Sequence, residues 1–335
     1  MAKKPSCWSS LIGLLALGGL LGIAAFGWFT SRYGWPIYLE LFSHFQVQYL
    51  IISLLLLGIL ALTRRRFMIV AGLFCCASLA VSVLSWYVPP AAFLPSQPAN
   101  LRVLVTNVNV RNRSYENTLA IAREASPDLA IFMEVDNAWI EQLNTLRDLL
   151  PYSSIDSESA SPGLAVYSRL ELINPRIEIF GTENKASVVT EIEVGDAAAT
   201  RRIALVATHP FPPVRPRLFH SRNRQLDQVG TYIQNFNQPT LLVGDLNTAM
   251  WSPYYRRLVN KTGLRNSRKG FGIIPTWPMP GTYERIPALV HSFFSIPIDH
   301  CLHSPEIRTV AIRAGAATGS DHAPIIVDLL IPPEE

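Results

Sequence analysis

The first quarter of the chain contains three long apolar segments, at about 9–29, 45–63 and 67–88. Each approaches the ~20 residues that an α-helix needs to cross a lipid bilayer. The first segment has no charged residue, and none of the three has the polar stripe expected of a helix packed on a globular core. A cleaved signal peptide fits the first segment less well, because its apolar core exceeds the usual ~7–15 residues and no convincing cleavage site follows. The pattern predicts three transmembrane helices.

The charged residues around these segments predict an orientation. Lys3 and Lys4 precede the first segment, and Arg64, Arg65 and Arg66 lie between the second and the third. The positive-inside rule places both basic clusters in the cytoplasm. Three crossings then put the rest of the chain on the other side. The sequence therefore predicts a multi-pass protein of the inner or plasma membrane, with a cytoplasmic N-terminus and an extracytoplasmic C-terminal region.

Beyond the membrane region, 1–88, a Pro-rich stretch at 89–98 is typical of an extended tether, and a region at 99–335 follows it. In this last region short apolar runs outnumber helical patterns and often follow one another directly, which favours an α+β fold over a doubly wound parallel sheet. We expect strands at 101–105, 129–133, 163–167, 176–180, 187–194, 203–208, 241–243, 298–302, 307–312 and 325–330, and helices at 114–125, 137–150 and 222–236.

Composition and charge agree with this division. The 335 residues are 49% hydrophobic and 16% charged, which is too apolar for one soluble domain and too polar for a wholly embedded protein. Residues 1–66 contain six Lys or Arg and one Glu, so the net charge of +4 leaves 4 − 5 = −1 for the rest. The basic excess is therefore a topology signal and does not indicate a nucleic-acid surface. Cys301 is the only Cys after the Pro-rich stretch, which excludes an internal disulfide there.

Polar side chains capable of chemistry stand at the ends of many predicted strands. The apolar run at 239–243 leads into Gly244-Asp245-Leu246-Asn247, and Gly319-Ser320-Asp321-His322 precedes the last strand. A single residue of this kind is usually a turn or cap residue. The feature recurs at six strand ends, in Asn107, Glu134, His209, Asp245, Asn247, Asp299, Asp321 and His322. One end of a layered sandwich can gather such residues into a polar cleft.

These motifs resemble the endonuclease/exonuclease/phosphatase superfamily, which includes deoxyribonucleases, abasic-site endonucleases, inositol polyphosphate phosphatases and neutral sphingomyelinases. The order of the motifs and the last three of them carry the resemblance most specifically. The matching stretches are 101–107, 131–135, 163–169, 207–210, 244–247, 298–300 and 319–322. The chain is most similar to bacterial membrane-anchored members with three leading helices. The resemblance implies a four-layer α/β sandwich of two mixed sheets with flanking helices, forming a catalytic domain at 99–335.

The resemblance also implies a divalent-metal-dependent hydrolase of phosphate esters, and the residue types suit that chemistry. Mg²⁺, with Mn²⁺ as an alternative, takes hard oxygen ligands, for which we expect Glu134 together with Asn107 and Asp321. Such an ion polarises a phosphoryl oxygen during attack by water. We expect Asp245 to orient or deprotonate that water, and Asn247 to hold a phosphate oxygen.

Two histidines complete the expected site. We expect His322 to act as a base or as a phosphate-binding cation, with Asp299 fixing its ring. His209 is expected to donate to the phosphate from the other side. Which of Asp245 and His322 accepts the proton stays open. His300 follows Asp299 on an alternating strand, points to the other face, and is expected to be structural.

The substrate stays open at this stage. Nuclease-type hydrolysis of phosphodiester bonds is the leading prediction, although the near-neutral charge of 99–335 is mildly against it. Hydrolysis of a phospholipid or its headgroup suits the membrane tether. A catalytically silent membrane interaction protein is a third reading, against which the complete set of candidate ligands argues. The expected partners are a phosphate-ester substrate and the lipid bilayer, with no obligate protein partner evident.

Two further features allow two readings each. The Pro-rich basic loop at 210–217, with Arg222 and Arg224 behind it, is either an ordinary solvated loop or a contact for substrate phosphate at a helix N-terminus. Trp251 and Trp277 are more often packing residues, but such rings also stack on bases or meet a membrane surface.

Overall fold

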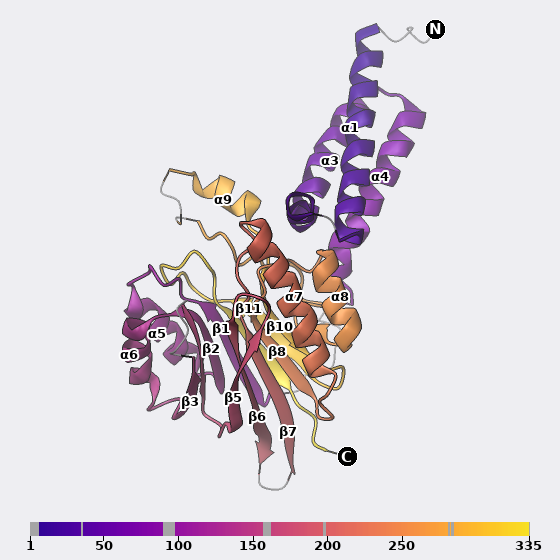
Figure 1. Ribbon diagram of the computed structural model, residues 1–335. Coiled ribbons are helices and arrows are strands. Elements are labelled where there is room, and N and C mark those ends of the chain that lie inside the picture. Colours follow the sequence, from indigo (N-terminus) through magenta and orange to yellow (C-terminus); the bar gives the residue numbers. More distant parts are fainter. Residues whose placement is uncertain are drawn as a thin grey trace.

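Three long helices stand beside one another at one end of the molecule (Figure 1). A computed structural model describes residues 7–34, 36–89, 98–156, 162–196, 199–280, 282 and 285–334. Its N-terminal helices are α1 (Cys7–Arg32), α2 (Ile37–Glu40), η1 (Leu41–Phe45), α3 (Gln46–Leu62), α4 (Arg66–Leu84) and η2 (Ser85–Tyr87). Three helical stretches, Trp8–Arg32, Ile37–Leu62 and Arg66–Tyr87, are long and apolar enough to cross a membrane. The three predicted apolar helices are therefore present, whereas Lys3, Lys4 and residues 90–97 of the Pro-rich stretch lie outside the described residues.

The three long helices pack through a small apolar core. Leu20 of α1 and Leu60 of α3 are fully buried in it, next to Cys75 and Cys76 of α4. Many other large apolar side chains of these helices point outward. An outward-facing apolar surface on a helix bundle is what a surrounding bilayer requires, because lipid and not water covers it.

The rest of the chain folds around two mixed six-stranded sheets. The strands of the first sheet lie in the order β11 (Arg308–Ala314), β12 (Ile325–Leu330), β1 (Leu101–Asn107), β2 (Leu129–Val135), β4 (Gly163–Ser168) and β3 (Tyr152–Ile155). Those of the second lie in the order β5 (Ile173–Phe180), β6 (Lys185–Asp196), β7 (Ala199–Thr208), β8 (Thr240–Asp245), β10 (Asp299–His303) and β9 (Arg265–Asn266). Among the strand pairs of the described residues, only β1–β2 and β7–β8 are parallel.

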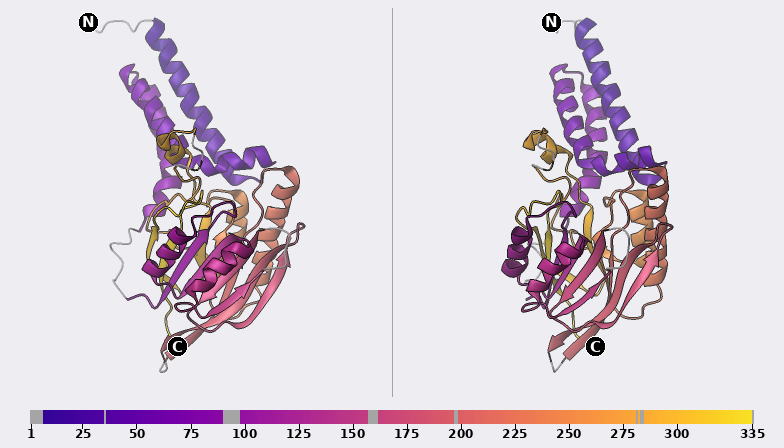
Figure 2. Two further views of the ribbon diagram at one scale, coloured as in Figure 1. Left: turned by 90° about the vertical axis from the view of Figure 1, so that its left-hand side faces the viewer. Right: turned by 60° about the vertical axis from the view of Figure 1, so that its left-hand side comes forward.

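The two sheets and their helices form four layers (Figures 1 and 2). The largest apolar cluster lies between the sheets, and separate clusters lie under the helices on each outer face. The first sheet carries α5 (Tyr115–Ala125), α6 (Asn137–Leu143) and η4 (Asn144–Leu146), and the second carries α7 (Pro216–Ile233) and α8 (Pro253–Thr262). The predicted α+β class and four-layer sandwich are confirmed.

Several element bounds differ from prediction, for local reasons. The helix expected at 222–236 begins at Pro216, because proline suits the first turn of a helix and Arg215 before it is extended. The helix expected at 137–150 ends at Leu143 and continues only as the short η4. Sequence reasoning missed β3, β9, α8 and α9 (Ala288–Phe294), of which α8 begins with an N-cap, Ser252, that accepts a hydrogen bond from Tyr254 N.

Strand register determines where the polar strand ends meet. In the first sheet Asn107 lies opposite Met133, so Glu134 follows one step beyond. In the second sheet Asp245 of β8 lies opposite Asp299 of β10. Since β1 and β2 are parallel, their carboxyl ends reach the same edge, and the same holds for β7 and β8.

Candidate active site

The ends of the central strands bring the predicted site residues into one cluster that links the two sheets. The amide Nδ2 of Asn107 donates to Glu134 Oε1 at 3.1 Å and to Asp245 Oδ2 at 3.2 Å. The two ring nitrogens of His209 lie 3.6 Å from Glu134 Oε1 and from Asp245 Oδ2. The side chain of Asn247 donates to the Pro210 carbonyl at 2.9 Å. Residues far apart in sequence thus share one hydrogen-bonded site.

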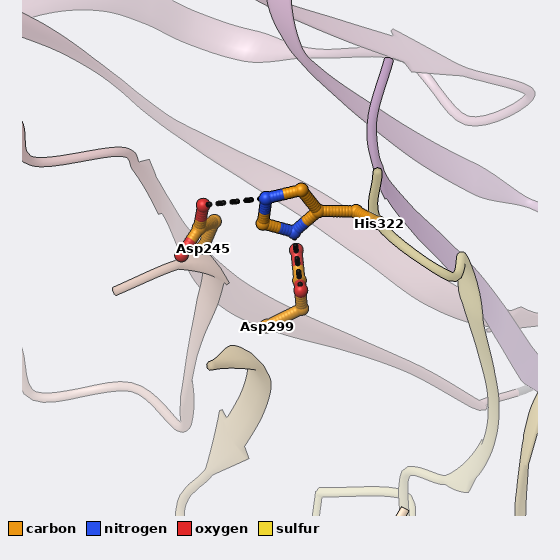
Figure 3. Close-up of side chains that lie close together, drawn as sticks. All are labelled: Asp245, Asp299 and His322. Carbon is orange, nitrogen blue, oxygen red and sulfur yellow. Dashed lines mark hydrogen bonds and ion pairs between the residues drawn. The ribbon is translucent and has the colours of Figure 1, made fainter. Parts of the chain in front are cut away.

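A second part of the cluster joins two carboxylates through an imidazole (Figure 3). His322 Nδ1 lies 2.9 Å from Asp299 Oδ2, and His322 Nε2 lies 3.7 Å from Asp245 Oδ2. Candidate ligand atoms of the three residues fall within 4.8 Å of one another, close enough to hold a metal ion. All three are buried, and Asp299 Oδ1 has no hydrogen-bond partner among the described residues.

Burial and neighbouring charges set the protonation of this cluster. Burial disfavours the imidazolium of His322, but the Asp299 and Asp245 carboxylates outweigh it and raise the His322 pKa to about 10. Burial and the Asp299 carboxylate raise the pKa of Asp245 to about 6. Burial also opposes ionisation of Glu134, yet the adjacent His209 lowers the Glu134 pKa to about 2. The site therefore combines an anionic Glu134, a cationic His322 and an Asp245 whose pKa lies near neutrality.

The backbone at both strand ends is specialised. Glu134 has a φ of 61° and sits where the β2–β4 register shifts, so a bulge turns this side chain out of the strand. Asn247 has a φ of 50°, in the left-handed region that few residues adopt. A Cβ at Gly244 would lie 1.9 Å from the Thr208 carbonyl oxygen, so only glycine lets β8 approach β7 here.

Sequence reasoning missed the residues that hold Asp321. Asn109 Nδ2 donates to Asp321 Oδ1 at 2.7 Å, and the indole Nε1 of Trp277 donates to Asp321 Oδ2 at 3.0 Å. Ser320 Oγ donates to the Asn107 carbonyl at 2.7 Å and thereby joins the last loop to β1. The sequence feature that could have pointed to Asn109 is its position two residues after Asn107. The contact of Trp277 depends on the tertiary fold and has no local signal.

A cavity of about 500 Å³ opens onto the cluster. Five of its lining residues are members of the predicted site: Glu134, Asp245, Asn247, Asp321 and His322. Leu41, His44 and Phe45 line it as well, and they come from η1, between α2 and α3. The N-terminal helical region therefore contributes a wall of the candidate active site.

Arg222 corrects one reading of the basic loop. Its guanidinium is fully buried, lies 3.1 Å from Glu40 Oε2 and donates through Nη1 to the Asn247 carbonyl at 2.8 Å. It is therefore a buried link between α2 and the Asn247 loop, and it does not face the cavity. Arg217, in the same loop region, is exposed and pairs with Glu183.

Two other residues singled out in the sequence contact neighbouring parts of the fold. Trp251 Nε1 donates to the Ser82 carbonyl of α4 at 3.0 Å, which links the sandwich to the long N-terminal helices. His300 makes its hydrogen bonds with Thr248 and Asn266, and burial lowers its pKa to about 3. A neutral, fully bonded His300 has the features of a structural residue.

Comparison with known proteins identifies the family. The sequence profile of the Endonuclease/Exonuclease/phosphatase family matches residues 104–322, more than half of the chain. The chain belongs to this family. Its C-terminal sandwich is accordingly an endonuclease/exonuclease/phosphatase-family phosphoesterase domain, preceded by three long apolar helices. No curated protein matches the chain in sequence.

Solved structures share the fold at low sequence identity. An endonuclease/exonuclease/phosphatase from Beutenbergia cavernae is 18% identical, with 70% of this chain and 72% of that chain covered and a TM-score of 0.53. D. rerio TDP2 complexed with single strand DNA product is 12% identical, with 68% and 98% covered and a TM-score of 0.53. The human Nocturnin catalytic domain with bound sulfate anion is 14% identical, with 70% and 94% covered and a TM-score of 0.53. Identities this low show the fold alone.

The residues present fit the divalent cation that the family typically requires. Glu134 and Asp321 are carboxylates only partly buried at the cavity wall, and Asn107 lies against Glu134. Oxygen donors of this type suit Mg²⁺ or Mn²⁺. A site on Asp245, Asp299 and His322 needs a neutral His322, because a protonated imidazole has no lone pair for a metal.

Proposed function

We propose that the chain is a membrane-anchored phosphoesterase that uses Mg²⁺ or Mn²⁺ to hydrolyse phosphate esters. The observation that carries the proposal is that His322, paired with the buried Asp299, lines one cavity together with three carboxylates, those of Glu134, Asp245 and Asp321. Folding does not require buried like charges and a cation at this place, since such groups are costly to desolvate. Their convergence on one cavity is typical of a catalytic site.

Glu134 and Asp321 would hold the metal ion, with Asn107 in support. Asn107 Oδ1 accepts from Asn109 N at 3.0 Å, so the placed amide clamps Glu134 and Asp245 and does not point its oxygen at the cavity. The ion would polarise a phosphoryl oxygen and neutralise charge that develops during attack. Asn109 and Trp277 fix both oxygens of Asp321, as partners of metal ligands commonly do.

Asp245 and His322 would divide the proton chemistry. A carboxylate with a pKa of about 6 is a suitable acceptor for a proton from water near neutrality, so we assign Asp245 as the base. His322, held protonated by Asp299, would donate to a phosphate oxygen and stabilise its negative charge. The opposite pKa shifts of these neighbours favour this division.

Asn247 and His209 would act on either side of that pair. Asn247 lines the cavity, and its amide would exchange the Pro210 carbonyl for a phosphate oxygen. His209 contacts the carboxylates of Glu134 and Asp245, so we propose that its main role is to position these two side chains and that donation to the phosphate is secondary.

The membrane region gives the proposal its cellular setting. We propose membrane helices within residues 1–88, a tether at 89–98 and a catalytic domain at 99–335, with the N-terminus cytoplasmic and the catalytic domain extracytoplasmic. Both basic clusters that flank the helices support this orientation. A phosphatase reporter fused after Glu335 is expected to be active. A reporter pair that gives signal only for a cytoplasmic C-terminus would overturn the orientation.

Hydrolysis of a soluble phosphodiester tests the activity. The full chain, purified in detergent, is expected to hydrolyse bis(p-nitrophenyl) phosphate with Mg²⁺ or Mn²⁺ and to lose this activity in a chelator. Asp245→Ala is expected to abolish it, because the variant lacks the base. Asp227→Ala removes an exposed carboxylate of α7 and serves as the control. Equal rates for wild type and Asp245→Ala would contradict the enzymatic function.

Nuclease activity, the leading prediction from sequence, stays a narrower proposal within this function. The TDP2 structure with single strand DNA product shares the fold, which is compatible with a nucleic-acid substrate. A nucleic-acid groove needs Lys or Arg along it to neutralise phosphates. The walls of this cavity favour another substrate class, as argued next.

A further inference from the structure

The walls of the active-site cavity above the polar cluster are almost entirely apolar. They are formed by Leu41, His44, Phe45, Pro212, Pro213, Val214, Trp277, Ile296 and Ile298. No Lys or Arg is among the described residues that line the cavity. The buried cations nearby are turned to other partners, Arg222 to Glu40 and Lys185 to the Pro162 carbonyl. A polyanion would find no counter-charge along these walls.

The segment formed by α2 and η1, here called the roof of the cavity, is amphipathic. In α2 and η1, which lie across the base of the long helices in Figure 2, Glu40 and His44 face the sandwich and are buried. Tyr38, Leu39 and Phe42 of the same segment are exposed. A short helix with one apolar face and exposed aromatic rings is typical of a membrane–water interface.

A second apolar element lies at the same level. Helix α9 stands beside the lower part of the membrane helices (Figures 1 and 2) and exposes Leu289 and Phe294. The rings of Phe294 and Phe45 are 6.2 Å apart, and Gln48 of α3 donates to the Phe293 carbonyl at 2.6 Å. Apolar side chains exposed on two neighbouring elements mark a surface that meets lipid or a partner. Their continuity with the membrane helices favours lipid.

Buried polar contacts hold the roof at a fixed height over the site. Glu40 pairs with Arg222, accepts a hydrogen bond from Ser252 Oγ and lies 3.5 Å from Thr248 Oγ1. Arg222 in turn holds the Asn247 carbonyl. The cavity therefore stays at the level where the long helices meet the sandwich.

We infer that the substrate is a membrane amphiphile with a phosphate ester in its headgroup. Its phosphate would reach the polar cluster from the bilayer, while the adjoining part of its chain lies against Leu41, Phe45 and Val214. This inference rests on the proposed phosphoesterase function and adds the substrate class. An apolar wall adds affinity for a chain because each methylene removed from water is stabilising.

Alkyl phosphates of two lengths test the inference without knowledge of the headgroup. The full chain is placed in phosphatidylcholine nanodiscs, and butyl phosphate and octyl phosphate are compared as inhibitors of bis(p-nitrophenyl) phosphate hydrolysis. At about fourfold per buried methylene, octyl phosphate is expected to inhibit at least ~10-fold more strongly than butyl phosphate. A 20-nucleotide single-stranded DNA is tested in the same assay as inhibitor and as substrate.

Variants separate binding in the cavity from simple partition into the bilayer. Leu41→Ser with Val214→Ser is expected to reduce the octyl-to-butyl ratio to about threefold or less, since the walls then bury fewer methylenes. Val214→Ser alone alters an exposed side chain, with 69% of its surface accessible, and gives a reading if the double variant folds poorly. Ile177→Ser with Ile179→Ser, on the exposed face of β5, is the matched control and is expected to keep the wild-type ratio.

The outcomes distinguish the two levels of the proposal. Without metal-dependent hydrolysis of the soluble diester, the phosphoesterase function itself is wrong. If the diester is hydrolysed but octyl and butyl phosphate inhibit equally, or the ratio is the same in the cavity variants and the control, the amphiphile inference is wrong and the function stands. DNA that is hydrolysed faster than the diester would overturn the inference in favour of a nuclease.

Discussion

The two sheets of the sandwich have the same arrangement but supply different chemistry. In each, the strand pairs run antiparallel, antiparallel, parallel, antiparallel and antiparallel across the sheet. The central parallel pair of each sheet carries site residues at its carboxyl ends. The first pair presents Asn107 and Glu134, and the second presents His209 and Asp245. The comparison shows that a repeated backbone geometry gathers the residues, while their surroundings decide what each can do.

The contrast is clearest between the two strand-end carboxylates. Glu134 projects from a bulge into a partly open position, where the adjacent His209 outweighs burial and lowers its pKa to about 2. Asp245 is fully buried beside Asp299, and burial together with that charge raises its pKa to about 6. A permanently ionised carboxylate suits a cation, and one that titrates near neutrality suits proton transfer. We therefore assign metal binding to the first sheet and water activation to the second.

The largest effect is expected from Asp245→Asn, which keeps the shape of the second-sheet carboxylate and removes its basicity. Hydrolysis of bis(p-nitrophenyl) phosphate is expected to fall by about 10⁴-fold, the upper end for loss of a general base. A higher Mg²⁺ concentration is not expected to restore it. The measurement is kcat across a Mg²⁺ titration, with Asp227→Asn as control. Recovery at high Mg²⁺ would assign Asp245 to the metal and break the contrast between the sheets.

Glu134→Gln is the matching change in the first sheet. At a fixed low Mg²⁺ concentration we expect a loss of about 10³-fold, because metal binding supplies several kcal/mol of transition-state stabilisation. Unlike Asp245→Asn, this variant is expected to recover most of its activity as Mg²⁺ is raised. Glu193→Gln changes an exposed carboxylate that pairs with Arg202 and provides the control. A loss that Mg²⁺ does not relieve would show that Glu134 acts elsewhere than on the metal.

The site residues that follow the second sheet are also linked to the N-terminal helices. Arg222, which holds the Asn247 carbonyl, forms a buried ion pair with Glu40 of α2. Glu40→Gln leaves a buried guanidinium without its counter-charge, which typically costs about 3 kcal/mol or more. The unfolding midpoint, followed by Trp fluorescence in detergent, is expected to fall accordingly. Replacing both residues by Met is expected to recover part of that stability, because no uncompensated charge is left. A midpoint unchanged in Glu40→Gln would mean that the pair does not anchor the loop.

Much of the fold and of the candidate site can be predicted from the sequence, because strand patterns, apolar segments and strand-end residues are local features. The eight predicted residues all lie at a strand end or within four residues of one. The strand register and the packing of the two sheets bring these ends together. The cavity wall formed by η1 cannot be predicted in this way. Leu41 and Phe45 lie in a stretch that the apolar pattern assigns only to a loop and a membrane helix, and Arg222 is read as exposed because its partner, Glu40, is 182 positions away (222 − 40). Contacts between the N-terminal helices and the sandwich depend on tertiary structure alone.

The smallest effect is expected from a change to Trp277, which positions Asp321, one of the proposed metal ligands. Trp277→Phe removes the indole donor to Asp321 Oδ2 and leaves Asn109 on Oδ1, so Asp321 keeps one of its two constraints. Loss of such a partner typically weakens metal binding by about tenfold, which we expect in the Mg²⁺ concentration for half-maximal rate with kcat nearly unchanged. Trp139→Phe is the matched control, because the Trp139 indole nitrogen is buried without a partner among the described residues and lies under the helices of the first sheet. An equal shift in both variants would trace the effect to packing and not to the hydrogen bond on Asp321.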